Sequence, residues 1–165
     1  MHYNKPIFIS TGLADNKQIE KIYKHIQKRW KRISNKKFFV FLHCVSCYPV
    51  LSDDVNLSAI QTLKKKFKNL QVGYSDHCKG IQAAVLSVAL GARVIEKHFT
   101  DNKNYSNFRD HQLSADPEEM KELVKLIRES EKLIGSGSLK ISENESKNLI
   151  HIRRSMAAKR FIPKG

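Results

Sequence analysis

The sequence has few of the residues that interrupt or cross-link a chain. It contains only 4 prolines, 7 glycines and 3 cysteines among 165 residues, while 41% of the residues are hydrophobic. So little Pro and Gly excludes collagen-like and low-complexity chains, and the hydrophobic share is typical of a globular protein with a packed core. The odd number of cysteines argues against a closed framework of disulfide bonds and favours a reducing compartment.

Long apolar stretches are also missing. No run of residues approaches the roughly 18 apolar residues that a membrane-spanning helix requires. The Met1–Lys5 start has no basic region followed by an apolar stretch, as a secretory signal would. We therefore expect a cytoplasmic protein that has no membrane partner.

Acidic residues are scarce relative to basic ones. The 30 Lys and Arg outnumber the 16 Asp and Glu, which gives a formal net charge of +14 at pH 7. Such a charge raises nucleic acid or an anionic surface as a partner. Much of the excess is Lys in helical stretches, such as Lys64–Lys66, with little aromatic interleaving for base stacking. We favour a solvated basic surface, and nucleic-acid binding stays as an alternative.

Four short apolar segments, rich in β-branched and aromatic residues, predict buried strands at residues 7–11, 38–45, 72–77 and 93–100. Each is followed by a helical pattern, and these patterns lie at about residues 16–31, 60–67, 81–90 and 117–134. Four strand and helix pairs imply parallel strands with right-handed crossovers. The fold class is therefore α/β, as either part of a barrel or a small doubly wound sheet.

Short polar and glycine signals mark the helix ends. Asp15 is available to cap the first helix, and Asp53, Asp54 and Asn56 are interpreted as capping residues of the second. Gly91 and Gly135 are placed to end the third and fourth helices, respectively. The glycine- and serine-rich residues 135–138 indicate a boundary, and a further helix is predicted over residues 143–153.

Polar and titratable residues cluster at the ends of the third and fourth predicted strands, where ligands gather in parallel α/β folds. Ser75 and His77 are two residues apart, as are Glu96 and His98, so each pair shares one face of its strand. The imidazoles can then bind a transition metal, and Glu96 or Asp110 can complete its shell, orient a histidine or bind substrate. The alternative is that each histidine is simply hydrogen-bonded in the core or exposed.

Cys44 and Cys47 form an isolated C-x-x-C pattern. Such a pattern is found in redox pairs and in zinc sites. No helix opens directly after it, because Tyr48 and Pro49 follow, and there is no second C-x-x-C. Structural cysteines are the favoured interpretation, and a zinc site that includes Cys78 is the alternative.

Several motifs together resemble the N-acetylneuraminate (sialic acid) synthase family, and they occur in the family's order. The motifs are Lys5-Pro-Ile-Phe-Ile-Ser-Thr-Gly-Leu-Ala14, Leu42-His-Cys-Val-Ser-Cys-Tyr-Pro49, Asp54-Val-Asn-Leu57, Gly73-Tyr-Ser-Asp-His77 and Val94-Ile-Glu-Lys-His-Phe-Thr100. The last residues, Arg153–Arg160 and Ile162–Gly165, are similar to the linker and first strand of the antifreeze-like domain that follows the family's barrel.

The resemblance implies that residues 1–135 are the C-terminal half of a (β/α)₈ TIM barrel, and that residues 136–165 are the linker and start of an antifreeze-like (SAF) domain. It implies condensation of phosphoenolpyruvate with N-acetylmannosamine or a related N-acylated amino sugar, giving a nonulosonic acid and phosphate. The expected partners are an N-terminal half-barrel and, in the complete enzyme, a second copy that forms a homodimer. The alternative is an inactive or split-gene half-barrel.

The resemblance also implies roles for particular residues. His77 and His98 would be the protein ligands of a divalent metal, Mn²⁺ with Mg²⁺ or Co²⁺ as alternatives. The other implied site residues are Glu96 and Asp110, which act in catalysis on the amino sugar, and Ser75, Tyr48, Ser46 and Asn56, which bind substrate. Two departures concern the sugar: Ser46 stands where some members have Asn, and residues 107–110 replace a frequent Gly-Pro-Asp.

Overall fold

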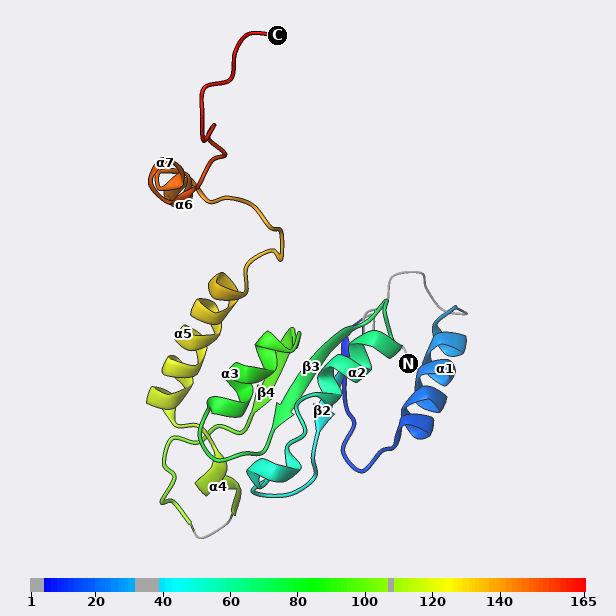
Figure 1. The fold of residues 1–165 in the computed structure, drawn as a ribbon. Helices are drawn as coiled ribbons and strands as arrows, with labels where there is room; N and C mark the ends of the chain where they lie inside the picture. The colour runs from blue at the N-terminus through cyan, green and yellow to red at the C-terminus, as the bar shows by residue number, and fades with distance from the viewer. Residues whose placement is uncertain (1–4, 32–38, 107–108) are drawn as a thin grey trace. The chain divides into compact units, whose positions relative to one another are not determined.

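The computed structural model describes residues 5–31, 39–106 and 109–165 (Figure 1). Internal contacts divide the chain into residues 1–134 and residues 135–165. The first part alternates strands with helices and contains β1 (Ile7–Ser10), α1 (Asn16–Lys31), β2 (Phe39–Cys44), α2 (Ala59–Lys66), β3 (Gln71–Asp76), α3 (Gln82–Ala89), β4 (Val94–Lys97), α4 (Arg109–Leu113) and α5 (Pro117–Ile134).

The four strands form one parallel sheet in the order β1-β2-β3-β4 (Figure 1). Neighbours in the sheet are therefore neighbours in the sequence, and each pair is joined by a helical crossover, as βαβ units require. The predicted α/β class with parallel strands is confirmed. The four predicted strands all form, although β4 ends at Lys97, three residues before the predicted end at Thr100.

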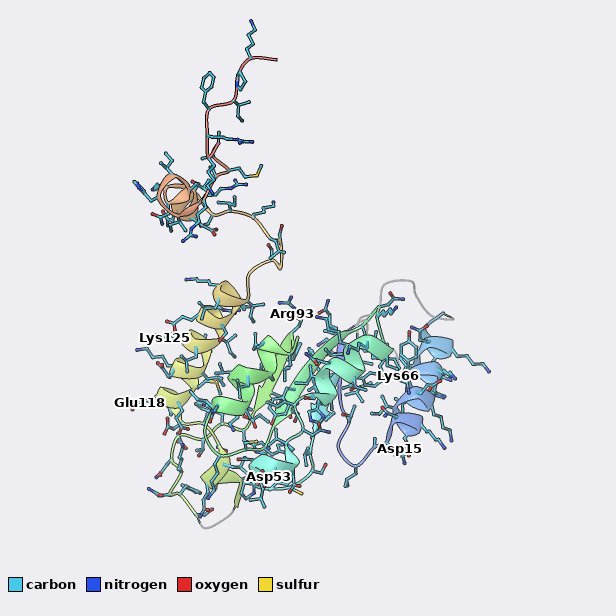
Figure 2. All side chains as sticks on the ribbon, in the orientation of Figure 1. Asp15, Asp53, Lys66, Arg93, Glu118 and Lys125 are labelled. Carbon is cyan, nitrogen blue, oxygen red and sulfur yellow. The ribbon has the colours of Figure 1, made fainter. Side chains whose placement is uncertain are left out.

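The first helix begins where its capping residue predicts. The Asp15 carboxylate accepts a hydrogen bond from Gln18 N at 2.7 Å, and the Gln18 side chain accepts one from Asp15 N at 2.8 Å. This reciprocal arrangement is a capping box. Figure 2 shows Asp15 near the start of α1 and Lys66 near the end of α2, where Lys66 Nζ lies 3.1 Å from the Glu20 carboxylate on α1.

The predicted capping of α2 by Asp53, Asp54 and Asn56 is wrong. Asp53 and Asp54 belong to a separate 3₁₀ turn over Ser52–Asp54, and the N-cap of α2 is Ser58, whose side chain makes no capping hydrogen bond. Asn56 has a φ of 44°, which is a left-handed conformation that Asn tolerates better than most residues. The chain therefore turns at Asn56 before the helix starts, and this turn separates all three residues from the helix.

The main core lies between one face of the sheet and the helices. Phe41, Val72 and Tyr74 on the strands are almost completely buried, together with Ile60 of α2. The Phe67 ring lies 5.3 Å from the Phe41 ring. Burying side chains of this size contributes about 1.5–3 kcal/mol each. Since α2 packs on β2 and β3, and α3 packs on β3 and on α5, this apolar layer fixes the helices against the sheet (Figure 1).

Glycines end the two helices for which they were predicted to do so. Gly91 has a φ of 102° just after α3, and Gly135 has a φ of 62° just after α5. The segment beyond Gly135 contains two short helices, α6 (Glu143–Ser146) and α7 (Leu149–Ile152), in place of the single helix predicted over residues 143–153. Among the described residues, no helix combines the length and apolar character needed to cross a lipid bilayer.

Gly73 permits close packing on the sheet face opposite the helices. A Cβ atom at this position would overlap the carbonyl oxygen of Val94 and would lie 2.5 Å from Leu42 Cδ2. Neither neighbour has an easy way to move, because one is backbone and the other is a buried side chain. The strands β2, β3 and β4 can keep their register only if this position has no side chain.

We predict that Gly73→Ala lowers the free energy of unfolding by about 1–3 kcal/mol, because overpacking forces backbone or side-chain shifts. The measurement is urea denaturation followed by circular dichroism. Ser138→Ala is the control, since Ser138 is exposed and lies outside the sheet. Equal midpoints for both variants would contradict the packing argument.

Candidate active site

Two histidines lie side by side at the ends of β3 and β4. His77 follows β3 directly and has 4% of its surface exposed, and His98 follows β4 and is half-buried. Their ring centroids are 5.2 Å apart and the rings meet edge to face. Alternation along the strands predicted this meeting, because both residues point to the sheet face opposite the helices.

A hydrogen bond fixes the orientation of the His77 ring. His77 Nδ1 lies 2.8 Å from the carbonyl oxygen of Val45. A carbonyl oxygen only accepts hydrogen bonds, so Nδ1 carries the proton and donates. In the neutral ring Nε2 then keeps its lone pair, which is the arrangement of a metal-ligating or proton-accepting imidazole.

Tyr48 covers the histidine pair. Its ring stacks on His77 with centroids 4.1 Å apart, and it lies 5.8 Å from the His98 ring. The loop that carries Tyr48 is held nearby, because Val50 N donates to His77 O at 3.1 Å. Tyr48 therefore lies close to both imidazoles, consistent with its predicted presence at a substrate site.

Ser75 and Glu96 lie on the same sheet face as the histidines, and each is two residues before its histidine in the sequence. They are register partners on β3 and β4, and Ser75 Oγ donates to Glu96 Oε1 at 3.2 Å. Ser75 is buried and Glu96 is exposed. This face therefore carries two imidazoles, a hydroxyl and a carboxylate whose second oxygen makes no protein hydrogen bond in the described part of the chain.

Ser46 and Asn56 line a cleft at the ends of β1 and β2. The cleft has a volume of about 650 Å³, and its walls also include Thr11 and Cys44. Ser46 approaches Gly12 so closely that a side chain on Gly12 would overlap the Ser46 hydroxyl. The histidine pair does not line this cleft. Cys44, which interacts with both Ser75 and Ser46, lies between the cleft and the histidine face.

Asp110 lies on α4, in the segment that follows β4. This segment returns to the strand end, since Ala115 N donates to His98 O at 2.8 Å. Within the described residues, no hydrogen bond or ion pair joins the Asp110 carboxylate to the histidines or to Glu96. The structure thus brings Tyr48, Ser75, Glu96 and the histidines together and leaves Asp110 on an adjoining segment.

The cysteines do not form the zinc site that was kept as an alternative. All three are free, with Cys44 and Cys78 buried and Cys47 exposed. Burial raises the pKa of both buried thiols, so in the metal-free protein they stay protonated at neutral pH. Cys78 belongs to the core between sheet and helices, whereas Cys44 lies near His77. In the part of the chain that is described, no group of three or more His, Cys, Asp or Glu is placed to hold a metal.

Sequence reasoning missed an ion pair behind the histidines. Asp76 and Lys97 precede His77 and His98, and their side chains are 0% and 2% exposed, with Lys97 Nζ 3.0 Å from Asp76 Oδ2. The signal was present, because each strand carries one charged residue at a position whose parity faces the apolar core. His43, also missed, is buried and lies 2.8 Å from Val55 O through Nε2.

Comparisons with a family model and with curated proteins agree on one family. The family model described as the NeuB family matches residues 1–139. The chain is 45% identical over 162 residues to the N,N'-diacetyllegionaminic acid synthase of Campylobacter jejuni, an alignment that covers 98% of this chain and 47% of that protein. It is 34% identical over 161 residues to human N-acetylneuraminate-9-phosphate synthase, covering 98% and 43% of the two proteins.

A solved structure resembles the fold as well. It is the N-acetylneuraminic acid synthetase of Leptospira borgpetersenii, with a TM-score of 0.78 and 38% sequence identity over 90% of this chain and 50% of that one. The chain spans about half the length of the curated relatives that it matches. The relatives named here are synthases of sialic or legionaminic acids. On the strength of the family model and these relatives, the chain belongs to the NeuB family.

Proposed function

We propose that this chain supplies half of the active site of a nonulosonic acid synthase. The reaction condenses phosphoenolpyruvate with N-acetylmannosamine or a related N-acylated amino sugar. The observation that carries the proposal is the pair of imidazoles at the ends of β3 and β4, with the Glu96 carboxylate on the same face. Family membership supports the class of reaction, and the strand ends are where catalytic residues gather in parallel α/β folds.

The histidine pair fits a divalent transition metal. The Val45 carbonyl fixes the His77 ring so that Nε2 is free to coordinate, and a second imidazole lies beside it. A site of two imidazoles beside a carboxylate accepts a first-row transition ion such as Mn²⁺ or Co²⁺ more readily than Mg²⁺, which takes oxygen ligands, and the family resemblance favours Mn²⁺, so we propose Mn²⁺ first. Two protein ligands leave open positions for substrate, and the metal would act there as a Lewis acid on the sugar aldehyde.

The remaining residues of this face would bind and orient the substrates. The nucleophile is C3 of phosphoenolpyruvate, which forms the new bond to the aldehyde carbon. Water then adds to C2, and phosphate leaves. Ser75 and Tyr48 lie beside the histidines and would contact phosphoenolpyruvate, with Ser46 and Asn56 in the adjoining cleft. Glu96 would accept hydrogen bonds from the amino sugar, and Asp110 would join it from the following segment.

The open edges of the sheet support a proposal that the chain requires a partner. The outer strands β1 and β4 each pair on one side within the described residues, and Phe8 on β1 is 51% exposed. Exposed edges and apolar faces favour association with further strands. We propose that an N-terminal half-barrel closes the sheet into a (β/α)₈ barrel, and that the complete enzyme is a homodimer. Residues 136–165 would then lead into an antifreeze-like (SAF) domain.

We predict that His77→Ala and His98→Ala, tested in the assembled barrel, each lower Mn²⁺-dependent phosphate release by more than about 100-fold. Removing a metal ligand abolishes Lewis-acid activation. The expected loss of activity is therefore larger than the 10–100-fold loss that is typical when a residue that only supports a ligand is removed. His25→Ala is the matched control, since His25 is exposed on α1. Near wild-type activity in either strand-end variant, with its fold intact by circular dichroism, would falsify the metal assignment.

We predict that the 165-residue chain alone releases no phosphate from phosphoenolpyruvate and amino sugar, and that it associates or aggregates. Four strands cannot close an eight-stranded barrel, so edges and apolar surface stay open. Adding the first half-barrel of a NeuB family member should restore both a defined mass and activity. Light scattering and a phosphate assay measure these outcomes, and a monodisperse, fully active monomer would contradict the proposal.

A further inference from the structure

The second register pair of β3 and β4 is a buried ion pair on the opposite face from the histidines. Asp76 and Lys97 are register partners, and their side chains are 0% and 2% exposed. Lys97 Nζ lies 3.0 Å from Asp76 Oδ2. Each of these residues directly precedes one of the two histidines, so the pair lies behind the candidate metal site.

Further hydrogen bonds extend this pair to the residue after His77. Asp76 Oδ1 accepts from the Tyr74 hydroxyl at 3.1 Å and from Cys78 N at 2.9 Å. Lys97 Nζ also donates to the carbonyl oxygen of Cys78. Both backbone polar groups of Cys78 are thus fixed by side chains. The backbone of His77 is held on both sides, and β4 is tied to it immediately before His98.

Both charged groups of the network have hydrogen-bond partners on β3, on β4 or at the residue after His77. Burial raises the pKa of the Tyr74 hydroxyl far above its usual value, so this group stays protonated and remains a donor to Asp76. Replacing a buried ion pair with apolar residues of similar volume is often neutral for stability, so stability alone does not account for the ions. Because an apolar pair could pack at these strand ends, the presence of ions there points to a role in positioning the neighbouring residues.

We propose that the Asp76–Lys97 pair is a positioning device for His77 and His98, which sets the separation and orientation of the two imidazoles from the far side of the sheet. This inference rests on the proposed function, since it concerns the same two histidines. The competing account is that the pair only joins β3 to β4. The two accounts differ in what happens when the strands stay joined but the ions are removed.

The decisive variant is the double substitution Asp76→Leu with Lys97→Met, made in the barrel assembled with its N-terminal half. It removes both charges together, because a single substitution would leave the other charge buried and unpaired and would unfold the strand ends. Lys66→Met is the matched control, since Lys66 also pairs with a carboxylate, that of Glu20, but between α1 and α2. Circular dichroism and urea denaturation first establish that both variants are folded.

Two measurements then test position. Co²⁺ titration followed by the visible absorption of the ion reports coordination by the histidines, and ¹⁵N NMR of the metal-free assembled barrel, with only this chain labelled at histidine, reports the tautomer of His77. In the double variant we expect about 10–100-fold weaker Co²⁺ binding, as is typical when groups that orient metal ligands are lost. We also expect a mixture of His77 tautomers, because the bond from Nδ1 to Val45 O is no longer enforced. Lys66→Met should match the wild type in both.

A folded double variant with wild-type Co²⁺ affinity and a single His77 tautomer would overturn the positioning role. If the wild-type assembled barrel binds Co²⁺ without using the histidines, the proposed function fails, but the tautomer measurement still decides the inference. A single tautomer in the wild type and a mixture in the double variant would support it. Identical tautomer populations in the two would contradict it.

Discussion

The parallel register of β3 against β4 sets which side chains can meet at the candidate site. It pairs Ser75 with Glu96 on the open face of the sheet and Asp76 with Lys97 on the helix face. The next residue on each strand is a histidine, and alternation returns both imidazoles to the open face. A shift of one residue would move the histidines into the apolar core and expose the ions, so the register and the chemistry are inseparable.

Much of this arrangement was predictable because it depends on local periodicity. The apolar segments predicted all four strands, and the spacing of two predicted which residues face together. The capping box at Asp15 and the glycine that ends α5 were equally local signals. Interactions between residues far apart in the sequence were harder to predict. The Asp76–Lys97 pair needs the register of two strands, and sequence spacing alone does not give that register.

The errors have physical causes of the same kind. Asp53 and Asp54 have the composition of capping residues, but the left-handed turn at Asn56 separates them from α2. The strand β4 ends at Lys97 because the segment returning through Ala115 takes up the backbone groups of His98 and Thr100. Loop geometry of this sort follows from tertiary contacts, so the position of Asp110 on α4 could not be read from its spacing.

We propose that the ends of β3 and β4 hold a catalytic metal between His77 and His98. The most direct test is anomalous diffraction at the manganese edge from crystals of the assembled barrel grown with Mn²⁺. The account predicts one strong peak on the open face of the sheet, within bonding distance of Nε2 of both histidines and on the same side as Glu96. A fully occupied peak elsewhere, or ordered histidines with no peak between them, would contradict it.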